Sequence, residues 1–135
     1  MATEKSTLKC LEEDYPDLRF VSGKKFAFRP PRTVVFEEGA DNFDLLILHE
    51  VGHALCGHKT FGMNIERLKM EVEAWGKARE LAETYAVPFD EEIVESELDT
   101  YRNWVHQKSR CPKCGLTRFE TREGEYRCPQ CDYFN

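Results

Sequence analysis

Two histidines and a glutamate stand together in the apolar stretch Leu45–Leu55, as His49-Glu50-Val51-Gly52-His53. On an α-helix, side chains four residues apart project from the same face, so both imidazoles can bind one zinc ion. Glu50 lies beside that metal without binding it, where it can take a proton from a metal-bound water and return it to a leaving amine. This spacing indicates hydrolysis of a peptide bond. The alternative is a core helix whose histidines only find hydrogen-bond partners, although burying these groups without a purpose is costly.

A catalytic zinc of this kind takes three protein ligands and leaves a fourth position for water. A helix expected over residues 64–85 offers Glu71 and Glu73, and helical phase separates them. Glu71 shares its face with apolar or small residues, whereas Glu73 sits about 200° around the helix on a charged face. We therefore expect Glu71 to be the third ligand. The alternative for Glu71 is a surface ion pair with Arg67 or Lys69.

Two other residues near the histidines are less suitable ligands. His58 follows His53 by five residues, whereas the extended metzincin motif places its third histidine six residues on, with a glycine between. We expect His58 to be a loop residue. Cys56 lies three residues past His53 and points about 300° around the helix from it, which predicts a packed thiol.

Four of the six cysteines form two tight pairs near the C-terminus, Cys111-Pro112-Lys113-Cys114 and Cys128-Pro129-Gln130-Cys131. Each pair can bend the backbone so that both thiolates reach one ion, and two pairs complete a tetrahedral site of four sulfurs. We expect a structural zinc, with disulfides or an iron–sulfur site as the alternatives. So short a segment cannot build an adequate core, so the metal should supply much of its folding energy.

The intervening chain predicts the elements that position these residues. We expect a short amphipathic helix through Leu8–Leu18, two strands paired as a hairpin around Ser22-Gly23, and a strand at Thr33–Phe36. Asp41 or Asn42 can cap the histidine helix, which should run to about Cys56. The helix over residues 64–85 ends before Pro88, and Asp90 caps a last helix to about His106. A hairpin should turn at Arg122-Glu123-Gly124.

The strand at Thr33–Phe36, the HELGH-like helix and a downstream Glu71-x-x-Ala74 together resemble the ImmA/IrrE-type metallopeptidases and, more broadly, minimal gluzincins. The resemblance covers about residues 30–85. It implies a zinc-dependent protease acting on repressor-like regulators, with His49, His53 and Glu71 as zinc ligands. It also implies that Val34, Val35 and Phe36 form the sheet edge that pairs with an extended substrate. The chain departs from this family in Trp75, in lacking a fused helix-turn-helix domain and in its added cysteine pairs.

The length of 135 residues suits one compact domain with a small appendage. We expect an α+β fold, with a small antiparallel or mixed sheet packed on a three-helix zincin-like core in residues 1–107. A C-terminal zinc ribbon with four cysteine ligands should occupy residues 108–135. The polar N-terminal residues and paired cysteines favour a cytoplasmic protein, and no apolar run is long enough for a membrane span.

Charge is unevenly distributed along the chain, whose net charge is −6. Residues 1–105 hold 13 Lys and Arg against 21 Asp and Glu, a net −8, and residues 106–135 hold 6 against 4, a net +2. The acidic body disfavours nucleic-acid binding, because affinity there comes from cancelling phosphate charge. Only the ribbon could bind nucleic acid, through Lys108, Arg110, Lys113, Arg118 and Arg127, with Phe119, Tyr126, Tyr133 and Phe134 for stacking.

These features predict a metallopeptidase that hydrolyses a protein or peptide substrate. Two alternatives stay open: a DNA-associated protease of the SprT-like kind, and a non-enzymatic adaptor that binds protein or nucleic acid through the ribbon. SprT-like proteases take a third histidine in an H-G context, in which His106 does not stand. The group that stabilises the oxyanion is open among Tyr85, Tyr101 and His106.

Overall fold

The computed structural model describes residues 4–59 and 63–131, which form four helices and five short strands of an α+β fold. Tyr133 and Phe134, expected to stack on nucleic acid, lie outside these residues. In the described part, no helix is both long and apolar enough to cross a bilayer. The elements in chain order are α1 (Glu4–Asp14), β1 (Arg19–Ser22), β2 (Ala27–Arg29), β3 (Thr33–Phe36), α2 (Phe43–Leu55), α3 (Asn64–Tyr85), α4 (Glu91–Ser109), β4 (Phe119–Glu120) and β5 (Tyr126–Arg127).

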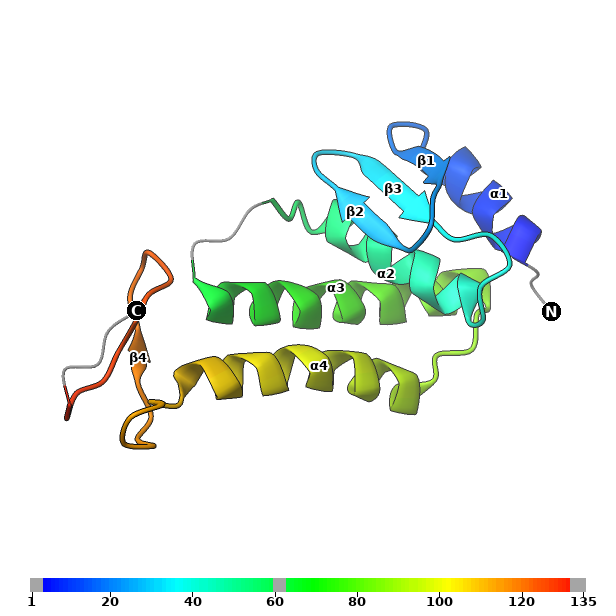
Figure 1. Cartoon of the computed structure of the whole chain (residues 1–135). Coiled ribbons are helices and arrows are strands. Elements are labelled where there is room, and N and C mark those ends of the chain that lie inside the picture. Colours follow the sequence, from blue (N-terminus) through cyan, green and yellow to red (C-terminus); the bar gives the residue numbers. More distant parts are fainter. Residues whose placement is uncertain (1–3, 60–62, 132–135) are drawn as a thin grey trace. The chain divides into compact units, whose positions relative to one another are not determined.

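The three N-terminal strands form one mixed sheet in the order β1-β3-β2, with β1 parallel and β2 antiparallel to β3 (Figure 1). The expected β1–β2 hairpin is therefore wrong, because the chain after β1 crosses to the far side of β3. Gly23 allows this crossing, since a Cβ there would clash with Val35 Cγ1. The prediction that Val34, Val35 and Phe36 form an edge is also wrong. β3 is the most apolar strand, and the fold buries it between two hydrogen-bonded neighbours.

Helix α2 packs against β2, β3 and α1, and this packing forms the core of the N-terminal region. Val34, Ile47, Leu48 and Val51 are fully buried there. The helix begins after Asn42, which has φ 59° and makes no side-chain capping bond, so the predicted side-chain cap is absent. Asp44 in the first turn instead places a negative charge near the positive end of the helix dipole.

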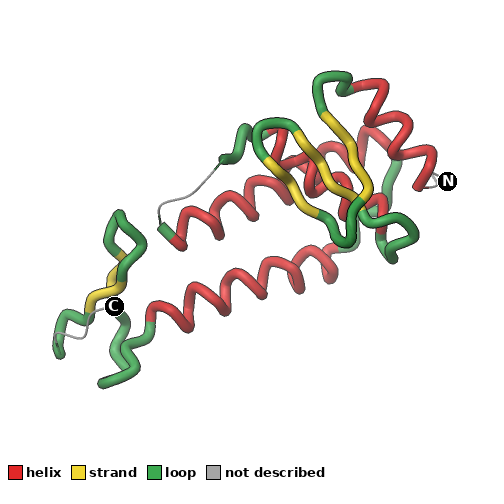
Figure 2. Tube along the Cα trace, turned by 45° about the horizontal axis from the view of Figure 1, so that its top comes forward, coloured by secondary structure: helices red, strands yellow, loops and turns green. Residues whose placement is uncertain are grey.

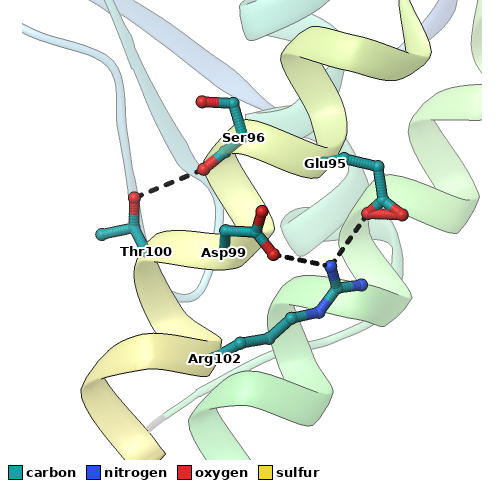
Figure 3. Close-up of polar contacts among 5 residues, drawn as sticks. All are labelled: Glu95, Ser96, Asp99, Thr100 and Arg102. Atoms are coloured by element: carbon teal, nitrogen blue, oxygen red, sulfur yellow. Dashed lines mark hydrogen bonds and ion pairs between the residues drawn. The ribbon is translucent and has the colours of Figure 1, made fainter. Parts of the chain in front are cut away.

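Helices α3 and α4 begin and end close to the predicted residues. The bounds predicted for α3 are confirmed, and α4 extends three residues past His106. Val94 and Leu98 supply the buried face of α4. On its exposed face Arg102 Nη1 donates to Glu95 and Asp99, each at 3.0 Å (Figure 3). Such exposed ion pairs contribute little to stability, because water and salt screen them.

Residues that contact one another fall into two units, Met1–Lys59 with Val72–Asp90, and Thr60–Glu71 with Glu91–Asn135. The boundary between Glu71 and Val72 lies inside α3, which continues through it as one uninterrupted helix. The expected division into two continuous segments, residues 1–107 and 108–135, differs from these contact-based units and stays a prediction.

In the second unit, the residues after α4 (110–131, the C-terminal segment) are mostly loop and carry the antiparallel pair β4–β5 (Figure 2). Glu120 on β4 accepts hydrogen bonds from the backbone N–H groups of Asn64 and Ile65. Tyr126 Oη accepts one from the Asn64 side-chain amide at 3.1 Å. The C-terminal segment thus caps the first turn of α3, whose free N–H groups and dipole favour a carboxylate.

Candidate metal centres

The first candidate metal site begins on α2, where the rings of His49 and His53 lie one turn apart with centroids separated by 4.7 Å. Each ring is held by an aromatic neighbour from another element. Trp75 of α3 stacks flat on His49, with centroids 4.1 Å apart, and Phe28 of β2 stacks on His53 at 6.2 Å. Trp75 is therefore the group that fixes the orientation of His49.

Helices α2 and α3 meet at two small residues, Gly52 and Ala74. A Cβ built on Gly52 would clash with the carbonyl oxygen of Ala74, so the two backbones are in direct contact there. Glu71 precedes Ala74 by three residues and Trp75 by four, and therefore shares their face of α3. The same continuous helix that stacks on His49 thus directs Glu71 towards the two histidines.

Ligand atoms of His49, His53 and Glu71 all lie within 4.8 Å of one another, and this group could hold a metal ion. Ligands around a tetrahedral zinc at about 2.0–2.2 Å lie roughly 3.3–3.6 Å apart, so these side chains would have to move somewhat closer together on binding an ion. Glu71 is 6% exposed and His53 7% exposed. A buried carboxylate between imidazoles fits a divalent ion, which offsets the cost of burying its charge.

Glu50 lies next to this group without belonging to it. Its Oε2 atom is 3.2 Å from His49 Nδ1, and its side chain is 10% exposed. The carboxylate is therefore both close to the ligands and largely removed from bulk water. The position agrees with a group that exchanges protons beside a metal rather than binding it.

His58 and Glu73 lie together in a way that the sequence did not predict. His58 is in a loop, as expected, but its side chain is only 8% exposed, and its Nδ1 lies 2.9 Å from His53 Nδ1. Its Nε2 lies 3.1 Å from Oε1 of Glu73, a residue expected on a solvated face and 48% exposed in its side chain. One sequence feature could have indicated this position of His58. Gly57 precedes it, and a glycine that ends a helix can turn the next residue back towards the helix.

Other residues weighed from the sequence lie elsewhere. The prediction of a packed Cys56 is wrong, because the thiol is exposed at the end of α2. Tyr85 Oη donates to Asp14 at 2.6 Å and lies fourteen residues after Glu71, roughly 21 Å along the helix axis. The guanidinium of Arg67 lies over the ring of Tyr101, 5.2 Å from its centroid. Arg67 is one helical turn before Glu71 on α3.

The second candidate site is formed by the four cysteines of the C-terminal segment, whose sulfurs also lie within 4.8 Å of one another. Cys111 and Cys131 sulfurs are 3.4 Å apart, and those of Cys114 and Cys128 are 3.5 Å apart. Sulfurs around a tetrahedral zinc at about 2.3 Å are roughly 3.8 Å apart, whereas a disulfide needs about 2.05 Å. The arrangement therefore fits a shared metal ion.

The backbone around Cys111 and Cys128 favours thiolates, the form that binds metal. A hydrogen bond from the backbone of Leu116 lowers the pKa of Cys114, but burial and the side chains of Cys128 and Cys111 outweigh it, so this pKa is raised instead. Burial raises the pKa of Cys111, but hydrogen bonds from the backbone of Cys114 and Lys113 outweigh burial and lower the pKa to about 6. The pKa of Cys128 is lowered in the same way, since backbone groups of Cys131 and Gln130 outweigh the effect of burial.

Two residues expected to bind nucleic acid have structural roles instead. Arg118 is 6% exposed, donates to the Lys108 carbonyl at 2.6 Å and lies over the ring of Tyr126, itself 4% exposed. Both side chains are buried and therefore offer little surface to a base or a phosphate. The exposed members of the predicted set are Lys108, Arg110, Lys113, Phe119 and Arg127.

Comparison of the chain with models of protein families, with curated proteins and with solved structures finds no match.

Proposed function

We propose that the protein is a zinc-dependent metallopeptidase of the gluzincin kind, resembling the ImmA/IrrE-type enzymes. The observation that carries this proposal is the group of His49, His53 and Glu71, the last two buried, with the Glu50 carboxylate beside it. Two imidazoles and one carboxylate are the ligand set of known gluzincin-type zinc sites, and they leave a position open to substrate and water. The four cysteines would hold a second, structural zinc.

In this proposal, bound zinc supplies Lewis acidity at the scissile carbonyl and makes water acidic enough to react near neutral pH. Glu50 accepts one proton from the attacking water while the water oxygen bonds to the carbonyl carbon. The same carboxyl then gives that proton to the amide nitrogen as the carbon–nitrogen bond breaks. Its position supports this role, because the carboxylate lies 3.2 Å from His49 Nδ1 and its side chain is 10% exposed.

We place the extended substrate against β2 rather than β3. β2 is an edge strand of the sheet, and Phe28 in its centre stacks on His53. A peptide added to this edge would run beside the metal ligands, and its backbone would pair with groups that β3 does not use. Repressor-like proteins are the substrate class that the family resemblance implies.

Metal content and a catalytic variant test the proposal. Wild type should bind two zinc ions per chain, and His49→Ala should bind one. Glu50→Gln should keep both ions and lose peptide cleavage, measured by mass spectrometry on a peptide library prepared from whole-cell protein. A wild type with one zinc that survives in His49→Ala, or equal cleavage by wild type and Glu50→Gln, would contradict the proposal.

A DNA-associated protease is a second candidate because of the exposed basic residues and Phe119 in the C-terminal segment. Addition of single-stranded DNA separates the two candidates. Cleavage that requires DNA supports the second candidate, and cleavage that is unaffected by it supports the first. A chain that holds zinc only at the cysteines supports the non-enzymatic adaptor.

A further inference from the structure

A buried imidazole that is not a ligand contacts one of the proposed ligands. His58 stands between His53 and Glu73, 2.9 Å from the first and 3.1 Å from the second, and its side chain is 8% exposed. A buried polar ring bonded on both sides is well satisfied, so its contacts define its orientation. The three side chains form a row, the His53–His58–Glu73 row, that runs from α2 through a loop to α3.

The backbone that ends α2 brings His58 to this position. Gly57 has φ 71°, a conformation that residues with a Cβ rarely adopt. Its N–H donates to the Ala54 carbonyl and the N–H of His58 donates to the His53 carbonyl, each at 3.1 Å. This pair of bonds is a Schellman motif. The turn folds the chain back, so His58 contacts His53 twice, through its backbone N–H and through its imidazole ring.

The distances in the row fit one assignment of the ring protons, in which Nδ1 of His53 donates and Nδ1 of His58 accepts. A carboxylate only accepts, so Nε2–H of His58 donates to Glu73. In this assignment Nδ1 of His58 accepts a hydrogen bond from Nδ1–H of His53. The lone pair of His53 is consequently on Nε2, which is the nitrogen that a metal would bind.

Helix α3 contributes to both ends of this arrangement. Glu71 belongs to the candidate metal site, and Glu73, two residues further, binds the outer side of His58. The Cys56 thiol also approaches the backbone carbonyl of Glu73, with sulfur and oxygen 3.8 Å apart. The end of α2 is thus held on α3 by contacts that do not involve the metal ligands themselves.

We propose that His58 and Glu73 are positioning residues that fix the ring orientation and the tautomer of His53 for metal binding. This inference rests on the proposed metal site and adds two residues that act through a ligand. Removing such a second-layer partner typically lowers metal affinity about 10–100-fold. The effect should be larger for His58, which contacts the ligand directly, than for Glu73.

The test measures zinc affinity in the full-length protein by competition with a chromophoric chelator. The site is identified as the one that His49→Ala removes. His58→Phe keeps the ring volume but has no nitrogen, and should weaken this site at least tenfold while the cysteine site is unchanged. His58→Gln keeps one acceptor and one donor, and should restore affinity to within about threefold of wild type.

Glu73→Ala should weaken the same site several-fold, and Glu83→Ala, an exposed residue further along α3, is its matched control. With Co²⁺ in the site, the visible absorption band should shift in His58→Phe and return in His58→Gln, a change that a loss of packing alone would not reverse. If His58→Phe does not fold, the Gln and Glu73 variants carry the test.

Several outcomes overturn the inference. Wild-type affinity in His58→Phe, or equal losses in His58→Gln and His58→Phe, would show that the hydrogen bonds do not support the site. Equal affinities of Glu73→Ala and Glu83→Ala would remove Glu73 from the row. These results would leave the proposed function standing, whereas a wild type with no zinc in the site that His49→Ala removes would overturn both.

Discussion

The close approach of α2 and α3 at Gly52 makes a quantitative prediction about the first metal site. Replacing Gly52 by alanine adds one methyl group where the carbonyl oxygen of Ala74 lies. Because that neighbour is backbone, it cannot rotate away, and the two helices must separate. Glu71 moves with α3, so the variant should lose both stability and zinc affinity.

The magnitude follows from a second helical glycine that lacks this contact. Gly76 is exposed on α3, and nothing lies within 4 Å of a Cβ built on it. Alanine in a helix interior is about 0.8–1.0 kcal/mol more favourable than glycine, and both substitutions gain this amount. Overpacking costs about 1–3 kcal/mol and applies only to Gly52→Ala. The two variants should therefore differ by about 1–3 kcal/mol, with Gly76→Ala the more stable.

Urea unfolding of both variants in the same zinc-containing buffer measures this difference, and chelator competition measures zinc affinity. Gly76→Ala should bind zinc as wild type does, and Gly52→Ala should bind it more weakly. Equal stabilisation by the two substitutions, or unchanged zinc affinity in Gly52→Ala, would refute the argument that backbone contact positions Glu71.

Four further predictions concern separate parts of the molecule. Glu50→Gln should abolish cleavage yet retain both metals by elemental analysis. Glu120→Ala should lower the unfolding free energy by about 0.5–2 kcal/mol because it removes the cap of α3, while Glu123→Ala in the neighbouring turn should not; equal effects would argue against the cap. Strong chelation should unfold the C-terminal segment first, detected as early loss of amide-exchange protection there. Burial and the hydrogen bond to Asp14 raise the pKa of Tyr85, so its stabilisation relative to Tyr85→Phe should be full below about pH 10 and decline at higher pH; a difference that does not change with pH would contradict this.

The helices could be predicted from the sequence because their signals are local. Polar and apolar residues alternate with helical periodicity in α3, and Pro88 prevents its continuation. The expectation that Glu71 faces the apolar side of α3 followed from the same periodicity, and the residue is 6% exposed. The four-cysteine group could be predicted because the spacing within each cysteine pair is visible in the sequence alone.

The order of the strands and the role of His58 could not be predicted, because both depend on contacts between distant segments. Nothing local to Thr33–Phe36 shows that a second strand pairs with each side of it. The distance of His58 from His53 along the sequence gives no sign of Glu73, which becomes a neighbour of His58 only because α2 packs on α3. A residue such as His58, which contacts a proposed ligand without binding the metal, is therefore hard to identify from the sequence.

The proposed zinc sites are best tested in a crystal of the full-length protein grown with zinc, with anomalous scattering recorded on both sides of the zinc edge. We expect two peaks per chain, one among the four cysteine sulfurs and one within about 2.0–2.2 Å of His49, His53 and Glu71. A map with a peak at the cysteines and none between the two imidazoles would contradict it.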